Sequence, residues 1–331
     1  MLIEYYNKME QYSTEFEEFY KTGIAVIPNV FSDEEVENIR NRFHCQLALN
    51  GIDHYKILSG EEIMLDAPRI KGRCADMYYS KWKIDAQLDQ RVYDIWKYLM
   101  GQTYGIKRDG FDHPFENFDD VIPFLDRVCY RLPDSIRAEG GLEMHLDRNI
   151  HDPYLLKSGG LKKWRPIQGF IALTDQYGSE NGGLKVVKGF HKYIDEYFSK
   201  SNEKCEEGGE FYRFMSKSHT ALEKKLEPIS VPKGSLVFFD NKLPHATCSR
   251  LSGNDTREVI YCSYLPTTLI NMNYCKEQLQ NIRLNIAPPN YVKEGMLPGQ
   301  YGKDWTEDEL NNLEKKLLGI YTHSKSHLEN M

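Results

Sequence analysis

The sequence predicts an α+β protein that is mainly β, with one antiparallel β core and helices around it. The 331 residues are enough for one large domain built on an elaborated barrel or sandwich. Short alternating runs separated by Gly, Pro, Asn and Asp fill the stretch from about 123 to 266, which is typical of antiparallel strands. We find no internal repeat and no low-complexity linker. We therefore expect a single domain over 1–331, with a helical part at about 1–122 and a helical extension at about 267–331.

The composition excludes several classes of protein. The 42 Lys and Arg residues against 49 Asp and Glu give a net charge of −7, which speaks against nucleic-acid binding by bulk charge. The seven cysteines are odd in number and form no C-x-x-C pair, which favours a reducing compartment. The N-terminus carries acidic residues where a signal peptide needs an apolar core, and no long apolar run occurs. We expect a cytoplasmic protein with no membrane span and leave its oligomeric state open.

The region before the β core contains three predicted helices and one strand. An aromatic-rich helix contains Phe16 and Phe19, and an apolar strand follows at Ile24–Ile27. Ser32 and Glu35 have the spacing of a capping box, which predicts that a second helix begins there. A third, amphipathic helix is predicted from the apolar positions Leu88, Val92, Ile95, Trp96 and Leu99.

Five strands are predicted within the β core, at 127–132, 167–174, 183–187, 236–239 and 258–265. A polar, helical insertion is expected at 193–225, and its acidic stretch at 203–210 is typical of a solvated loop. A closing amphipathic helix is expected at 305–318, with Asp304 or Thr306 as its cap.

The candidate chemistry of this sequence is metal chemistry. The motifs of P-loops, dinucleotide folds, HExxH metalloproteases and GxSxG hydrolases are all missing. His145 and Asp147 lie two residues apart, so in a strand both side chains face the same side and could bind one ion. His245 follows the predicted strand 236–239 and could add a third ligand. Two imidazoles and one carboxylate leave open coordination positions, the arrangement that non-haem Fe(II) oxygenases use.

Arg257 opens the last predicted strand, where it shares a face with Val259 and Tyr261. If that face lines the barrel, the buried guanidinium needs an anion such as the carboxylate of a cosubstrate. The alternative is a surface arginine that pairs with Asp255 or Glu258.

Several motifs in order resemble the phytanoyl-CoA dioxygenase family of Fe(II)- and 2-oxoglutarate-dependent oxygenases. They are Glu17 to Pro28 with Ser32-Asp33-Glu34-Glu35, His145-x-Asp147, Ala172 to Asp175, Glu180 to Leu184, Lys188 to Lys192, Lys233-Gly234-Ser235 to His245, and Arg257. The resemblance covers about residues 15–266. It implies a double-stranded β-helix, the jelly roll, with helices packed outside.

The resemblance also implies roles for individual residues. His145, Asp147 and His245 would be the catalytic Fe(II) ligands, and Arg257 and Thr247 would bind 2-oxoglutarate. The implied reaction is hydroxylation of a small organic substrate by O2, with release of succinate and CO2. Two departures stand out: Lys188-Gly189-Phe190-His191 replaces the family's Pro-Gly-Ser-His turn, and the usual Asn-x-Ser is missing before Arg257. His191 is interpreted as closing a turn and not as a further metal ligand.

Two other functions stay open at this point. One is a catalytically silent jelly roll that binds a metal or a carboxylate. The other is a zinc hydrolase, which would leave Arg257 without a role. The remaining histidines are interpreted as structural or solvated, and two cysteines as small core residues: His44, His113, His151, His323, His327, Cys248 and Cys262.

The segment from Arg148 to Arg165 has a positive net charge, whereas the net charge of the whole chain is negative. It holds five basic side chains and one acidic one, Asp152. Next to the metal motif, and with Ser158-Gly159-Gly160 as a hinge, it could close over the site and attract an anionic substrate. The alternative is a solvated basic loop without a role.

Overall fold

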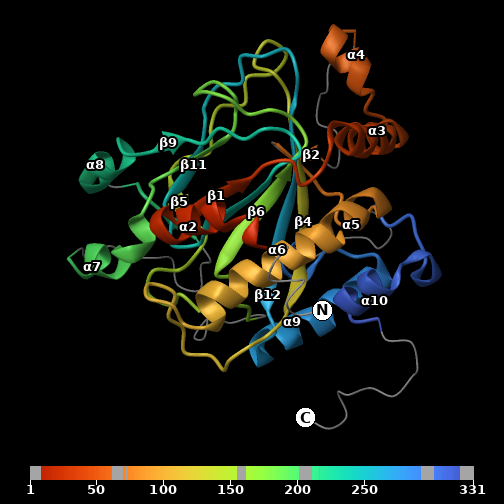
Figure 1. Cartoon of the computed structure of the whole chain (residues 1–331). Helices are drawn as coiled ribbons and strands as arrows, with labels where there is room; N and C mark the ends of the chain where they lie inside the picture. Colours follow the sequence, from red (N-terminus) through yellow and green to blue (C-terminus); the bar gives the residue numbers. More distant parts are fainter. Residues whose placement is uncertain are drawn as a thin grey trace.

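Strand pairing divides the β core into two antiparallel sheets (Figure 1). The computed structural model describes residues 9–61, 70–71, 73–154, 162–200, 211–215, 217–291 and 302–320. The larger sheet has the order β1 (Ile24–Ile27), β10 (Leu236–Asp240), β6 (Ile167–Ala172), β12 (Arg257–Pro266), β4 (Val121–Arg131), β3 (Cys74–Ala75), β2 (Ile70–Lys71). The smaller sheet has the order β8 (Tyr212–Arg213), β5 (His145–Leu146), β11 (His245–Thr247), β7 (Leu184–Val186), β9 (Glu227–Pro228). The antiparallel β core with flanking helices that the sequence predicts is confirmed.

Alternate residues of the larger sheet belong to two different cores. On β10, Val237 and Phe239 join a cluster with Leu146 and Val186 of the smaller sheet. Leu236 and Phe238 face the other way, into the cluster formed with the helices. Because side chains alternate along a strand, a fully apolar strand such as β10 is explained by burial on both faces. One core thus lies between the sheets and the other lies under the helices.

Helices α5 (Lys81–Gln87) and α6 (Gln90–Met100) cover the outer face of the larger sheet (Figure 1). The ring of Trp96 lies 4.8 Å from that of Phe238 and 5.7 Å from that of Tyr264. The prediction of one helix from Leu88 to Leu99 was wrong at its start. Asp89 accepts a hydrogen bond from the Arg91 N–H and caps a new helix, so Leu88 ends the helix before it.

The N-terminal predictions are confirmed by α2 (Ser13–Thr22), β1 and α3 (Asp33–Leu49). Both bonds of the capping box are present: Ser32 Oγ accepts from Glu35 N–H at 3.2 Å, and Glu35 Oε2 accepts from Ser32 N–H at 2.8 Å. β1 pairs with β10, so the N-terminal part completes the edge of the larger sheet. The short α4 (His54–Ser59) follows α3.

One long helix, α9 (Leu269–Leu284), lies within the helical extension expected at about 267–331, although its own bounds were not predicted. Its buried face is polar, because Asn271, Gln278 and Asn281 donate to backbone carbonyls of Trp164, Pro123 and Ala287, all at 2.9 Å. The closing helix α10 (Asn312–Leu318) is capped by Asn311, so the predicted caps were wrong. Thr306 caps a separate 3-10 turn at Glu307–Glu309.

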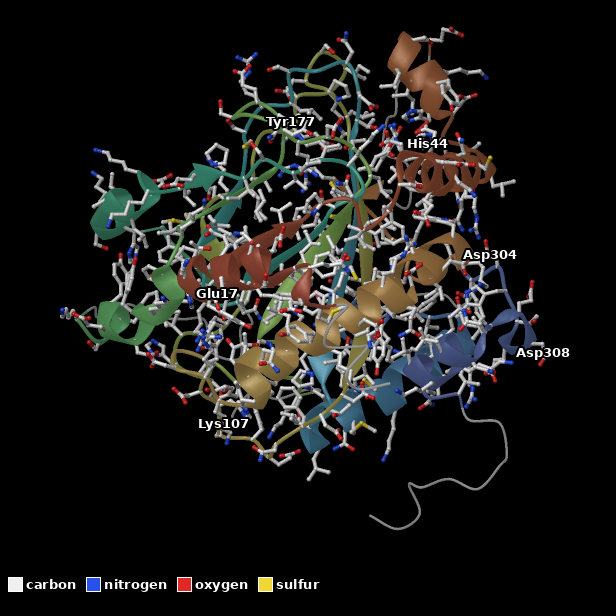
Figure 2. All side chains as sticks on the ribbon, in the orientation of Figure 1. Glu17, His44, Lys107, Tyr177, Asp304 and Asp308 are labelled. Carbon is white, nitrogen blue, oxygen red and sulfur yellow. The ribbon has the colours of Figure 1, made fainter. Side chains whose placement is uncertain are left out.

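The insertion after β7 contains α7 (Ile194–Ser199), β8 and α8 (Thr220–Glu223), in part the helical structure expected there. Its acidic stretch at 203–210 lies outside the described residues. Figure 2 shows the labelled Lys107, Tyr177 and Asp308 at the periphery of the molecule. None of the helices in the described ranges is long and apolar enough to cross a membrane.

Candidate metal centre

Strand pairing brings together the three residues that the sequence predicts as metal ligands. His145 on β5 is the direct register partner of His245 on β11, and their ring centroids lie 4.1 Å apart. Asp147 follows β5, with Oδ1 3.4 Å from Nε2 of His145 and Oδ2 3.7 Å from Nε2 of His245. One ligand atom from each residue lies within 4.8 Å of the other two. One ion could therefore contact all three side chains.

Backbone carbonyls fix which nitrogen of each imidazole faces the centre. Nδ1 of His145 lies 2.7 Å from the carbonyl oxygen of Glu143, and Nδ1 of His245 lies 3.0 Å from that of Leu243. A carbonyl oxygen only accepts, so each Nδ1 carries the proton. Nε2 of each ring therefore faces Asp147 and is the nitrogen that could bind a metal ion, as in metal-ligating histidines.

The charge states of His245 and Asp147 suit a divalent cation, whereas at His145 a cation would have to displace the proton that Asp147 favours. Burial, and next the neighbouring His145, lowers the pKa of His245 to about 4, so this imidazole is neutral at pH 7. Burial would raise the pKa of Asp147, but the bond to His145 and both imidazoles hold it well below its usual value. Burial lowers the pKa of His145, yet the hydrogen bond and charge of Asp147 outweigh burial and raise it. An ionised carboxylate with two imidazoles fits Fe(II) by the chemistry of its donors.

A cavity of about 470 Å³ opens beside this cluster. Asp147 forms part of its wall, with Arg148, Tyr154, Trp164 and Arg165. Nη2 of Arg165 lies 3.8 Å from Oδ2 of Asp147. The candidate metal centre is thus open on the side where a small molecule could enter.

Arg257 lies at the start of β12 and is 4% exposed. Its Nε donates to Oε1 of Gln176 at 2.8 Å, and Nη1 lies 3.2 Å from Sγ of Cys129. Among the residues that the structure describes, no carboxylate forms an ion pair with it. The alternative of a surface pair with Asp255 or Glu258 does not hold, because Arg257 is buried and both acids pair with Arg40 at 3.0 Å.

The hydroxyl of Thr247 has two donors around it. Oγ1 accepts from the Leu142 N–H at 2.6 Å and from Nη1 of Arg73 at 3.1 Å. Thr247 lies two residues past His245 on β11 and so shares its side of the strand. Arg73 is a residue that the sequence analysis did not select; only its contact with Thr247 identifies it.

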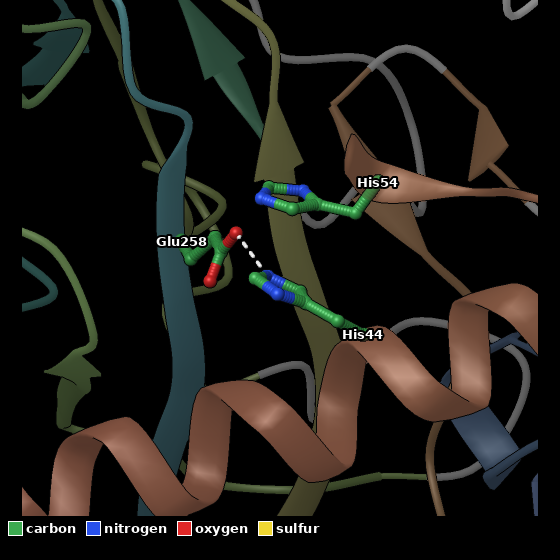
Figure 3. A group of neighbouring side chains, drawn as sticks. All are labelled: His44, His54 and Glu258. Carbon is green, nitrogen blue, oxygen red and sulfur yellow. Dashed lines mark hydrogen bonds and ion pairs between the residues drawn. The ribbon is translucent and has the colours of Figure 1, made fainter. Parts of the chain in front are cut away.

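A second cluster of potential ligands, which the sequence analysis missed, consists of His44, His54 and Glu258 (Figure 3). Nε2 of His44 lies 2.8 Å from Oε1 of Glu258, and Thr256 donates to the same oxygen at 2.6 Å. Arg40 donates to the other oxygen at 3.0 Å. The alternation of side chains along β12 predicts that Glu258 faces away from an inward Arg257, but it does not identify the histidines that meet Glu258.

This second cluster is arranged as a buried ion-pair network. The rings of His44 and His54 stack with centroids 3.6 Å apart and planes 17° apart. Imidazole lone pairs lie in the ring plane, so those of two nearly parallel rings do not converge on one ion. Both oxygens of Glu258 already have donors. The structural interpretation of His44 therefore agrees with its surroundings.

The remaining histidines and cysteines named in the sequence analysis, where the structure describes them, lie outside the cluster of three candidate ligands. His191 is buried in the cavity wall, with its ring 5.6 Å from Phe111, and lies outside the cluster of three ligands. His113 is buried, and its Nε2 lies 2.9 Å from the carbonyl of Tyr104. Cys248 and Cys262 are buried free thiols. His323 and His327 lie outside the described residues.

Part of the basic segment 148–165 lies on the cavity wall. Lys163 and Trp164 are buried and Lys162 is exposed, so the segment is not simply a solvated loop. The expected hinge at 158–160 and Lys157 lie outside the described residues.

Comparisons with known proteins agree with the family resemblance. A Dictyostelium discoideum protein named "Putative phytanoyl-CoA dioxygenase" is 30% identical over 154 residues, which is 46% of this chain and 39% of that protein. The match thus spans well under half of that relative's length.

Solved structures show the same fold at low sequence identity. The Candida albicans protein GIG2 (DUF1479) has a TM-score of 0.70 and 18% identity over 95% of this chain and 78% of its own. The Escherichia coli protein JW0805 has a TM-score of 0.70 and 16% identity, and the match covers 96% of this chain and 84% of that protein. The family profile for phytanoyl-CoA dioxygenase (PhyH) matches residues 19–259, most of the chain. This chain therefore belongs to the phytanoyl-CoA dioxygenase family.

Proposed function

We propose that the protein is a mononuclear Fe(II)- and 2-oxoglutarate-dependent dioxygenase that hydroxylates a small organic substrate. The observation that carries the proposal is the convergence of His145, Asp147 and His245 beside an open cavity. We also infer that the two sheets form the jelly roll, in one domain over the whole chain.

Each residue of the proposed site has a defined task. His145, Asp147 and His245 would hold the iron through Nε2, a carboxylate oxygen and Nε2. When bound, iron with 2-oxoglutarate supplies the O2 chemistry that yields succinate and CO2. Arg257 would bind the distal carboxylate of 2-oxoglutarate through a planar two-donor fork, which explains why its guanidinium is buried with no carboxylate partner among the described residues. Thr247 would contact the same cosubstrate.

Metal binding and cosubstrate binding can be tested together without knowing the substrate. Anaerobic addition of Fe(II) and then 2-oxoglutarate should produce the weak visible charge-transfer band of the chelate. Asp147→Ala should lose the band, because one of three iron ligands is removed. Asp308→Ala, an exposed acid far from the site in the sequence, should retain it.

Two results would reject the proposal. A wild-type protein that binds Fe(II) but gives no band with 2-oxoglutarate would favour a silent binding protein. A band of full intensity in Asp147→Ala would place the iron elsewhere.

A further inference from the structure

We propose that Arg148 binds an anionic group of the primary substrate, a carboxylate or a phosphate, inside the cavity beside the metal centre. The inference rests on the proposed function, because it identifies the molecule in this cavity as the substrate. It concerns a residue that the metal and 2-oxoglutarate do not use.

Arg148 directly follows the metal-ligand candidate Asp147 and lies in the cavity wall. Its side chain is only partly exposed, and its Nε is buried without a hydrogen-bond partner. Within the described ranges it forms no ion pair. A guanidinium that is partly removed from water is stabilised by a bidentate anion, and the cavity that Arg148 lines has room for one.

The neighbouring charges leave Arg148 available for a ligand. Arg165 on the same wall already faces two carboxylates, at 3.8 Å from Asp126 and 3.8 Å from Asp147. Asp240, an acid of the same wall, accepts from the Tyr104 hydroxyl at 2.7 Å and from the Lys242 N–H at 2.8 Å. Asp147, the acid next to Arg148 in the sequence, would bind the metal, and the buried Asp240 accepts hydrogen bonds from other donors.

The buried and half-buried part of the cavity wall holds four cations and two acids, and the exposed part holds three acids and Lys192. Lys163 and Arg165 add positive charge to that of Arg148, and both lie over the ring of Phe124, at 5.9 and 4.7 Å. The further acids of the cavity, Asp109, Asp112 and Asp195, are all exposed. An anionic group is thus favoured at the inner end, close to the reacting centre.

Polar and aromatic groups surround the proposed anion site. The positive charge of Arg148 lowers the pKa of the Tyr104 and Tyr154 hydroxyls, although burial raises both more strongly. Both phenols therefore stay protonated; the Tyr104 hydroxyl already donates to Asp240, so the Tyr154 hydroxyl is the one that can donate to an anion. Trp164 adds an aromatic wall. This combination suits an organic acid or organic phosphate better than an inorganic ion.

The experiment uses benzoate and phenyl phosphate as probes, with benzyl alcohol as the neutral comparator. Binding to the metal-free full-length protein is measured by calorimetry, and again with excess 2-oxoglutarate so that the Arg257 site does not contribute. We expect at least one anionic probe to bind, more weakly as salt rises, and benzyl alcohol to bind at least tenfold more weakly. If benzoate binds more tightly, the site prefers a carboxylate; if phenyl phosphate binds more tightly, it prefers a phosphate.

Arg148→Met should weaken the anionic probe at least tenfold, and Arg148→Lys should weaken it less. The matched control, Lys162→Met, removes an exposed charge of the same segment that is not part of the cavity wall and should change affinity less than twofold. Equal affinity in Arg148→Met and wild type, or no anionic probe bound, would overturn the inference.

The charge-transfer assay separates this inference from the proposed function. Arg148→Met should keep the band with Fe(II) and 2-oxoglutarate. A band in the wild type without probe binding rejects only the anion site. Probe binding that depends on Arg148, without any band, rejects only the oxygenase.

Discussion

Arg257 and Glu258 are consecutive residues of β12 whose side chains bind partners on opposite faces of the strand. Arg257 contacts Gln176 and Cys129 on the inner side. On the outer side Glu258 is held by His44 of α3 (Figure 3) and by Arg40 of the same helix. The helix outside the sheet therefore fixes the strand that carries the proposed 2-oxoglutarate arginine.

Glu258→Gln should lower the free energy of unfolding by about 3 kcal/mol, because it removes a buried carboxylate and leaves Arg40 and His44 without their partner. Urea denaturation measures this. The matched control is Glu307→Gln, which breaks the exposed pair with Arg283 and should cost at most about 1 kcal/mol. Equal effects of the two substitutions would contradict the role of the buried network.

The same carboxylate should make stability depend on pH. Burial alone would raise the pKa of Glu258, but the hydrogen bond from His44 and the charge of Arg40 lower it from 4.5 to about 2. A depressed folded pKa contributes stability that is fully present above 4.5 and is lost as pH falls toward 2. The stability difference between wild type and Glu258→Gln should therefore shrink across this window in urea titrations. A difference in stability that stays constant with pH would mean that the charge of Glu258 does not contribute to the stability of the fold.

Arg257→Lys should raise the apparent KM for 2-oxoglutarate with a smaller effect on kcat. A lysine ammonium cannot reproduce the planar two-donor fork, and the lost contact is worth about 1.5 to 3 kcal/mol. This corresponds to roughly a 10- to 150-fold increase in KM. Succinate release measures it once a substrate or uncoupled turnover is available.

Arg250→Lys serves as the matched control, because its side chain is 64% exposed and pairs with Glu180 at the surface. The KM of this control variant for 2-oxoglutarate should stay at the wild-type value. An unchanged KM in Arg257→Lys would mean that the distal carboxylate is bound by another residue.

The parts of the fold that depend on local patterns could be predicted from the sequence. The capping box at Ser32 and the apolar strand at Leu236 needed only their neighbours in the chain. The buried polar face of α9 could not be predicted in this way, because Asn271 and Gln278 form their hydrogen bonds with distant carbonyls. A polar side chain with such partners looks like a surface residue in the sequence.

The candidate site shows the same division. The two-residue spacing of His145 and Asp147 predicts a shared face, and the structure brings both to His245. The partners of Thr247 and Glu258 could not be predicted, because Arg73, Arg40 and His44 reach them from segments far away in the chain. Contacts that depend on tertiary packing leave no periodic signal.

Gly169→Ala should be strongly destabilising, because Gly169 lies in the centre of β6, where the backbone of the next strand approaches closely. A Cβ there would lie 2.1 Å from the Val237 carbonyl oxygen and 3.1 Å from the Trp96 ring. Neither a paired strand nor a buried indole can move away, so we expect a loss of at least about 3 kcal/mol in urea denaturation. Gly253→Ala is the control, since a Cβ there meets its nearest atom at 4.0 Å and should change stability by less than about 0.5 kcal/mol. Wild-type stability in Gly169→Ala would mean that β6 and β10 can separate locally, and the sheet that supports the candidate metal centre would then be less rigid than the structure indicates.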